Sequence, residues 1–189
     1  MLLLVVFFVM LIAYSAIDTD RFLQKQILEK AAQDVSRTAP DMNQAMQSLQ
    51  HLAVAAGMSG NISFAKTEDG IKAVVPNPVL FSSGGASLNK SVHSILDGII
   101  RIAQQHDLAI QVEGHTDNRP IKTAKYPSNW ELSTIRAVNI LRYFQDKGGM
   151  PPKRLAAVGF AAYHPVANND TPEGRQQNRR IEIILRPST

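Results

Sequence analysis

The first seventeen residues carry no charged side chain, and no other feature constrains the fold of this chain as strongly. Between Met1 and Ile17 only Tyr14 and Ser15 bear hydroxyl groups. A helix of this length rises roughly 25 Å, slightly less than the roughly 30 Å hydrocarbon core of a bilayer. The run is apolar on every side, whereas a helix at the edge of a globular core has one polar face. We therefore expect residues 1–17 to form a transmembrane helix.

Two other interpretations of this run fit less well. A secretory signal begins with basic residues and ends at a small-residue cleavage site. No Lys or Arg precedes the run, and Ala13–Ala16 contains no A-x-A site. A buried core helix is the other interpretation, but amphipathicity is absent and the run is apolar all round.

Charge and cysteine content exclude several classes of function. The net charge of +4 is mild and comes without a basic block, which argues against nucleic-acid binding. The absence of cysteine excludes disulfides, a lipid anchor on Cys and Cys-ligated zinc.

Residues 18–57 have the pattern of a helical connector. An amphipathic helix is expected over residues 20–37, and Pro40 ends it. Asp41 can cap a second helix that stops at Gly57. The apolar face of the first helix comprises Phe22, Leu23, Ile27 and Leu28. Such a face needs a membrane surface, a partner or a second copy to cover it. Alternatively, both helices are the first elements of one globular domain.

From residue 58 onward, strand and helix patterns alternate, which predicts a mixed sheet with helices on one face. An Asp-Gly turn at 69–70 favours a hairpin between the first two strands. Ser128 begins a capping box. The expected strands are 62–65, 71–75, 108–112, 155–159 and 181–185, and the expected helices begin after Ser87, Ser128 and Thr171.

An acidic residue lies in the loop after the third strand, and a basic residue lies on the helix that follows this loop. Asp117 lies in the loop after the strand, and Arg136 lies on the helix between apolar neighbours. A partly buried guanidinium needs an acceptor and suits a carboxylate bidentately. Facing one cleft, the two could hold a zwitterion, with Asp117 binding an ammonium and Arg136 a carboxylate. The alternative is a structural Asp117–Arg136 salt bridge without a ligand.

Catalytic chemistry has little support in the sequence. His115 has no accompanying nucleophile motif, and the other histidines lack the close spacing of a zinc site. We expect His115 to be a strand-end residue held by backbone hydrogen bonds, and Trp130 to pack rather than stack on a ligand. No catalytic residue, metal or cofactor is predicted.

Five motifs in order make residues 70–186 resemble the OmpA-like peptidoglycan-binding domain. They are FSSGGASL at 81–88, GHTDN at 114–118, NWELSTIRA at 129–137, the run 154–159 and NRRIEIIL at 178–185. The insertion at 119–128 and the apolar run at 2–11 are similar to the flagellar motor stator B (MotB-type) branch of that family.

The resemblance implies a fold and a ligand. The expected fold is an α/β (α+β) two-layer sandwich with helices on one face of a mixed sheet, spanning residues 58–189. Members bind the diaminopimelate of the peptidoglycan stem without cleaving it. By motif match, the binding residues are Asp117 and Arg136, with accessory positions at Thr116, Asn129, Leu132 and Arg179.

The stator resemblance further implies a homodimer and a multi-span membrane partner subunit. The chain would cross the bacterial inner membrane once and place its C-terminal domain in the periplasm, and residues 18–37 would act as a plug or, alternatively, a spacer. Stator B subunits carry an ion-accepting Asp near the start of their helix, whereas residues 1–17 contain no acid. The chain is therefore expected to lack the start of that helix or to be a degenerate relative. A non-motor cell-wall tether is the alternative function.

Overall fold

The computed structural model describes residues 4–7, 22–28, 30, 41–82 and 84–188. The chain divides into two units, residues 1–39 and residues 40–189. In the first unit, residues 4–7 and 22–28 are helical. Over the described ranges, no helix has both the length and the apolar character needed to cross a bilayer. Most of the helix expected at 1–17, and most of the plug or spacer expected at 18–37, lies outside the described residues.

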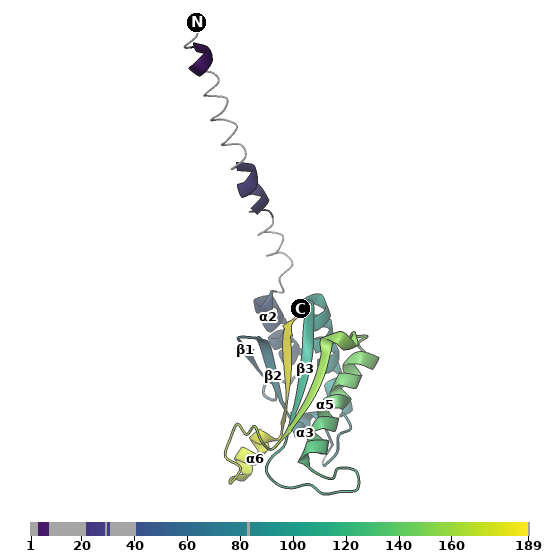
Figure 1. Ribbon diagram of the computed structural model, residues 1–189. Coiled ribbons are helices and arrows are strands. Elements are labelled where there is room, and N and C mark those ends of the chain that lie inside the picture. The colour runs from purple at the N-terminus through teal and green to yellow at the C-terminus, as the bar shows by residue number, and fades with distance from the viewer. Residues whose placement is uncertain (1–3, 8–21, 29, 31–40, 83, 189) are drawn as a thin grey trace. The chain divides into compact units, whose positions relative to one another are not determined.

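The second unit is built on a five-stranded sheet (Figure 1). Its strands are β1 (Ser63–Thr67), β2 (Gly70–Pro76), β3 (Leu108–His115), β4 (Leu155–Ala161) and β5 (Arg180–Pro187). Their order across the sheet is β1-β2-β5-β3-β4. Only β3 and β4 are parallel, and the other neighbours are antiparallel. The predicted mixed sheet is confirmed, including the hairpin at Gly70.

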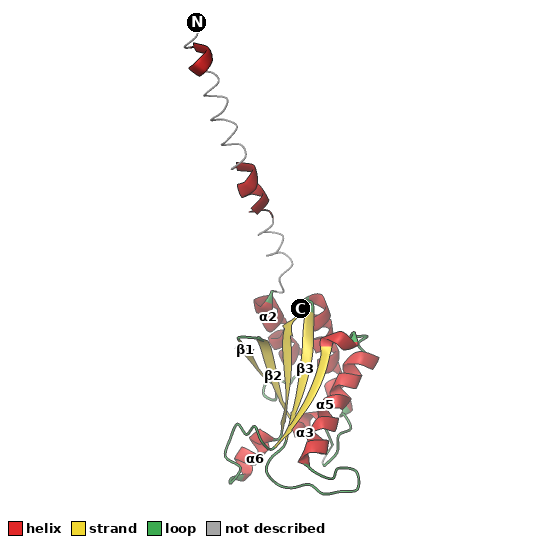
Figure 2. Cartoon of the chain, in the orientation of Figure 1, coloured by secondary structure: helices red, strands yellow, loops and turns green. Residues whose placement is uncertain are grey.

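Helices cover the far face of the sheet in the view of Figure 2. The helices of this unit are α2 (Met42–Ala55), α3 (Asn77–Leu80), α4 (His93–Gln105), α5 (Asn129–Asp146) and α6 (Pro172–Asn178). Alternate residues of each central strand meet α2, α4 and α5 in one apolar core; Ile110 and Ile183 lie in it with Ile99 and Phe144. Strand side chains alternate between faces, so this core accounts for the period-two pattern of the sequence.

The start of one helix differs from the prediction. Ser128 caps α5 as expected, accepting a hydrogen bond from the Trp130 amide. The helix expected after Ser87, however, begins only at His93, after a 3-10 turn. The preceding loop closes on itself, since Asn89 donates its backbone amide to Leu80 O and its side-chain amide to Val79 O. These bonds hold the chain out of helical geometry until the loop is complete.

Helix α2 belongs to the compact unit, so the domain boundary expected at residue 58 is wrong. Ala45, Leu49 and Ala53 are buried in the shared core, and Leu52 packs onto Gly98 of α4. The second unit accordingly begins at Pro40 and contains a complete core of its own. Sequence periodicity predicts the helix and its apolar face, but it does not show which part of the protein packs against that face.

Truncation of Leu49 tests this assignment. Leu49 is fully buried, and a Leu→Ala change at such a site costs about 2–5 kcal/mol. Leu49→Ala should therefore lower the free energy of unfolding of residues 40–189 by that amount in urea titrations. Val54→Ala is the matched control, because Val54 lies on the same helix and is 66% exposed. If the two variants were equally stable, α2 would be a connector after all.

Candidate functional site

All six residues predicted for the site line a single cleft of about 830 Å³. The cleft lies between the segment after β3, the first half of α5, helix α3 with the loop after it, and Arg179, which immediately precedes β5. The predicted residues that line it are Thr116, Asp117, Asn129, Leu132, Arg136 and Arg179.

A glycine sets how closely the two main elements of the cleft approach. Gly114 on β3 lies against the backbone of Ser133 on α5, and a Cβ atom at Gly114 would overlap the Ser133 carbonyl. Asp117 follows Gly114 by three residues, and Arg136 follows Ser133 by three residues. The contact therefore fixes the separation of β3 and the first turns of α5, the two elements next to which Asp117 and Arg136 lie.

Asp117 is buried but ion-paired, and its partner is not the one considered from the sequence. Its Oδ2 lies 2.5 Å from Nη1 of Arg179, and its Oδ1 accepts a hydrogen bond from the Arg119 amide at 3.1 Å. The structural Asp117–Arg136 salt bridge is absent from the ion pairs of the described residues. Arg179 instead orients the carboxylate toward the cleft while leaving lone pairs on both oxygens for a further donor.

Arg136 is only 6% exposed and has no carboxylate partner among the residues that the structure describes. Its Nε donates to the Gly85 carbonyl at 2.9 Å, and its guanidinium carbon lies 5.3 Å from the centroid of the Phe81 ring. Burial lowers the pKa of the guanidinium, and Arg179 nearby lowers it further, while Tyr126 and Asp117 raise it. The two terminal nitrogens are left to bind an anion in the cleft.

The three uncharged accessory residues, Thr116, Asn129 and Leu132, shape the cleft. The Asn129 side chain donates to the carbonyls of Asp117 and Arg119, which ties the loop after β3 to the start of α5. Leu132 packs with Tyr126, which belongs to this loop, and with Ala86. Thr116 donates to the Asp117 carbonyl.

Sequence reasoning assigned no role to Phe81 and Gly85, which together seat the Arg136 guanidinium. Both lie in the FSSGGASL motif, which was the available signal. A motif shows that a loop matters, but not which atom of it faces the arginine.

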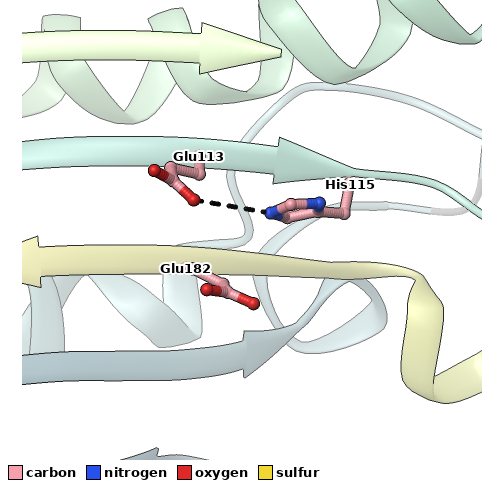
Figure 3. Close-up of side chains that lie close together, drawn as sticks. All are labelled: Glu113, His115 and Glu182. Atoms are coloured by element: carbon pink, nitrogen blue, oxygen red, sulfur yellow. Dashed lines mark ion pairs between the residues drawn. The ribbon is translucent and has the colours of Figure 1, made fainter. Parts of the chain in front are cut away.

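A second polar cluster lies where β3 and β5 pair (Figure 3). Potential ligand atoms of Glu113, His115 and Glu182 all lie within 4.8 Å of one another. Glu182, however, is already paired with Arg180 at 2.7 Å and with Lys72 at 3.0 Å. The two cations balance the two carboxylates, so no excess negative charge attracts a divalent metal ion.

The electrostatics of this cluster match a structural ion-pair network. Burial raises the pKa of Glu182, but hydrogen bonds from Arg180 and Lys72 outweigh it and lower the pKa overall. The pKa of Glu113 is lowered chiefly by His115, whose Nε2 lies 3.8 Å from the Glu113 carboxylate. The backbone of His115 is held as expected, with its carbonyl accepting from Asn77 Nδ2 at 3.1 Å, and its buried ring stacks on Phe160.

Known proteins with similar sequences share the domain that contains the cleft. The sequence profile of the OmpA family matches residues 80–179, more than half of the chain. The uncharacterized protein YtxE of Bacillus subtilis is 34% identical over 98% of this chain and 84% of its own length. Motility protein B of the same organism is 35% identical over 64% of this chain and 47% of its own length. The peptidoglycan-binding protein ArfA of Mycobacterium tuberculosis is 34% identical over 64% of this chain and 36% of its length.

Two solved structures are similar to the fold. A MotB-like protein from Desulfovibrio vulgaris aligns with a TM-score of 0.71 at 30% identity, covering 78% of this chain and 94% of that one. The cell wall anchor of the T6SS from Pseudomonas aeruginosa aligns with a TM-score of 0.68 at 31% identity, covering 74% and 97%. The chain spans less than half the length of motility protein B and ArfA, so similarity to these two proteins concerns the domain that they share with it.

Proposed function

Because the chain belongs to the OmpA family, we propose that its cleft binds peptidoglycan without cleaving it and so anchors the protein to the cell wall. Asp117 accepts the side-chain ammonium of diaminopimelate in the peptide stem, and Arg136 binds the carboxylate on the same side chain. Arg179 holds Asp117 in place for this contact.

One observation carries the proposal: a buried arginine and a buried aspartate share a cleft without pairing with each other. A guanidinium that is 6% exposed loses much of its hydration, and an anion that enters the cleft restores the missing interactions. The carboxylate of Asp117 offers the opposite charge nearby. The arrangement is complementary to a ligand that bears both an ammonium and a carboxylate.

The finer proposal is that the anchored complex is a flagellar motor stator. Similarity to motility protein B of Bacillus subtilis and to a MotB-like structure supports it. In that role the chain forms a homodimer, and the dimer assembles with a multi-span membrane subunit. The chain crosses the inner membrane once through residues 1–17 and binds the wall in the periplasm. Residues 18–37 then act as the plug. The alternative is a non-motor tether, which similarity to the T6SS cell wall anchor supports.

Co-sedimentation with purified sacculi tests the wall-binding role. Residues 40–189 contain a complete core and the whole cleft, so this fragment should pellet with sacculi that contain diaminopimelate. A fragment that stays in the supernatant at every sacculus concentration would contradict the proposal.

A further inference from the structure

Two large aromatic side chains lie exposed beside each other next to the cleft. Trp130 is 47% exposed and Tyr163 is 71% exposed. Their ring centroids are 5.2 Å apart with an angle of 22° between the planes, so the rings stack. Trp130 was predicted to pack, and its ring does pack against Tyr163. Nearly half of the Trp130 surface nevertheless remains exposed. Contiguous exposed apolar surface of this kind marks binding sites in soluble domains.

Trp130 also lines a second hollow, of about 520 Å³. Its wall combines apolar and aromatic side chains with a polar rim. The apolar part is Tyr126, Trp130, Ile135 and Val138, and the rim is Lys125, Glu131 and Thr134. The Lys125 ammonium lies 5.5 Å from the centroid of the Tyr126 ring, in cation–π contact with another lining residue. An apolar concavity with a few polar groups at its edge is the usual form of a small-molecule site.

The hollow and the cleft are neighbours on the same segment. Asn129 lines the cleft and Trp130 lines the hollow, and their Cα atoms are about 3.8 Å apart as consecutive residues. Tyr126, from the hollow, packs against Leu132, from the cleft. A peptide stem of three residues spans at most about 11 Å. A stem held in the cleft therefore keeps the sugar to which it is attached within reach of the hollow.

We propose that this hollow binds an N-acetylated hexosamine of the peptidoglycan glycan strand. One carbon–hydrogen face of the sugar ring lies on Trp130, and the acetamido methyl enters between Ile135 and Val138. The sugar hydroxyls and the amide hydrogen-bond with the rim. Tyr163 stacks on the indole ring and restricts its orientation. This subsite rests on the proposed wall-binding function and extends it from the peptide stem to the glycan.

The chemistry of the hollow favours a sugar over another protein. A sugar ring offers a flat apolar face with polar groups around its edge, and the hollow has the same division between wall and rim. Covalent attachment of glycan to stem adds a high effective concentration once the stem is bound. The chain therefore gains affinity from a weak sugar site that would be of little use alone.

Trp130 is the only tryptophan of the chain, so its emission reports on the hollow directly. Residues 40–189 are titrated with a peptide-free oligomer of N-acetylglucosamine. We expect a saturable shift of the emission to shorter wavelength, with half or more of the change lost for the corresponding glucose oligomer. Tyr163→Ala should lower the affinity for the N-acetylglucosamine oligomer about two- to tenfold, because an aromatic pair contributes free energy on that scale. Val166→Ala is the matched control, since Val166 is similarly exposed but is not part of the Trp130–Tyr163 stack.

Each outcome supports or overturns the subsite. An unchanged emission, or an equal response to both oligomers, would overturn it. An emission that depends on protein concentration without sugar would assign the surface to a second copy of this chain and overturn it as well. Arg136→Ala should leave oligomer binding intact, because Arg136 does not line the hollow. Loss of sacculus binding in that variant would therefore concern the cleft alone, and the two assignments can be tested separately.

Discussion

Arg136→Ala is expected to reduce the affinity of residues 40–189 for sacculi by more than tenfold. A hydrogen bond to a charged group contributes about 1.5–3 kcal/mol, and about 1.4 kcal/mol corresponds to tenfold. The Arg136 fork can form two such bonds with one carboxylate. Asp117→Ala should have a comparable effect. Without the Asp117 carboxylate, the ammonium of the ligand loses its acceptor and is repelled by the unpaired Arg179.

Matched variants separate the clamp from the general charge of the domain. Arg101→Ala removes the same charge from an exposed position on α4 and should bind sacculi like the wild type. Arg136→Lys keeps the charge but loses the fork and the Nε bond to Gly85, so its affinity should lie between those of wild type and Arg136→Ala. Wild-type binding by both Arg136→Ala and Asp117→Ala would rule out the clamp. Urea titration of each variant shows whether the fold is intact.

Gly114→Ala is expected to damage stability and binding together. A Cβ at this position would overlap backbone atoms of Ser133, which no rotamer change can relieve. Overpacking typically costs about 1–3 kcal/mol, and contact with backbone on the opposing element favours the upper part of that range. Helix α5 must move away from β3 to admit the methyl group. That movement would separate Asp117 from Arg136, so sacculus binding should fall even at temperatures where the variant is folded.

Gly60→Ala is the control for this change. No atom lies within 4 Å of a Cβ built at Gly60, and the residue has no left-handed backbone conformation. Urea titration should therefore give Gly60→Ala the stability of the wild type. If Gly114→Ala matched it in both stability and binding, the close β3–α5 contact would not be what sets the geometry of the cleft.

Local signals predicted much of this fold because they act over a few residues. The Asp-Gly turn that ends at Gly70 pairs Gly70 with Thr67, three residues earlier, and the Ser128 cap bonds the amide of Trp130 two residues away. The start of α4 was predicted wrongly because a capping residue at Ser87 competes with hydrogen bonds from Asn89 that only the folded loop reveals.

Long-range contacts explain what the sequence could not predict about the site. Asp117 and Arg136 follow from a motif, but the ion pair that orients Asp117 comes from Arg179, 62 residues later in the chain. The Gly85 carbonyl that seats Arg136 lies 51 residues earlier. No periodicity links residues at such separations. The same holds for Tyr163, which stacks on Trp130 from the segment after β4.

Discrimination between two peptide stems tests most directly whether the cleft clamps a zwitterion. Isothermal titration of residues 40–189 is carried out with a stem tripeptide ending in meso-diaminopimelate and with the same tripeptide ending in lysine. Both side chains offer an ammonium to Asp117, but only diaminopimelate offers a side-chain carboxylate to Arg136. We predict saturable binding of the diaminopimelate stem and at least tenfold weaker binding of the lysine stem. Equal affinities, or no binding of the diaminopimelate stem, would contradict the assignment of the cleft.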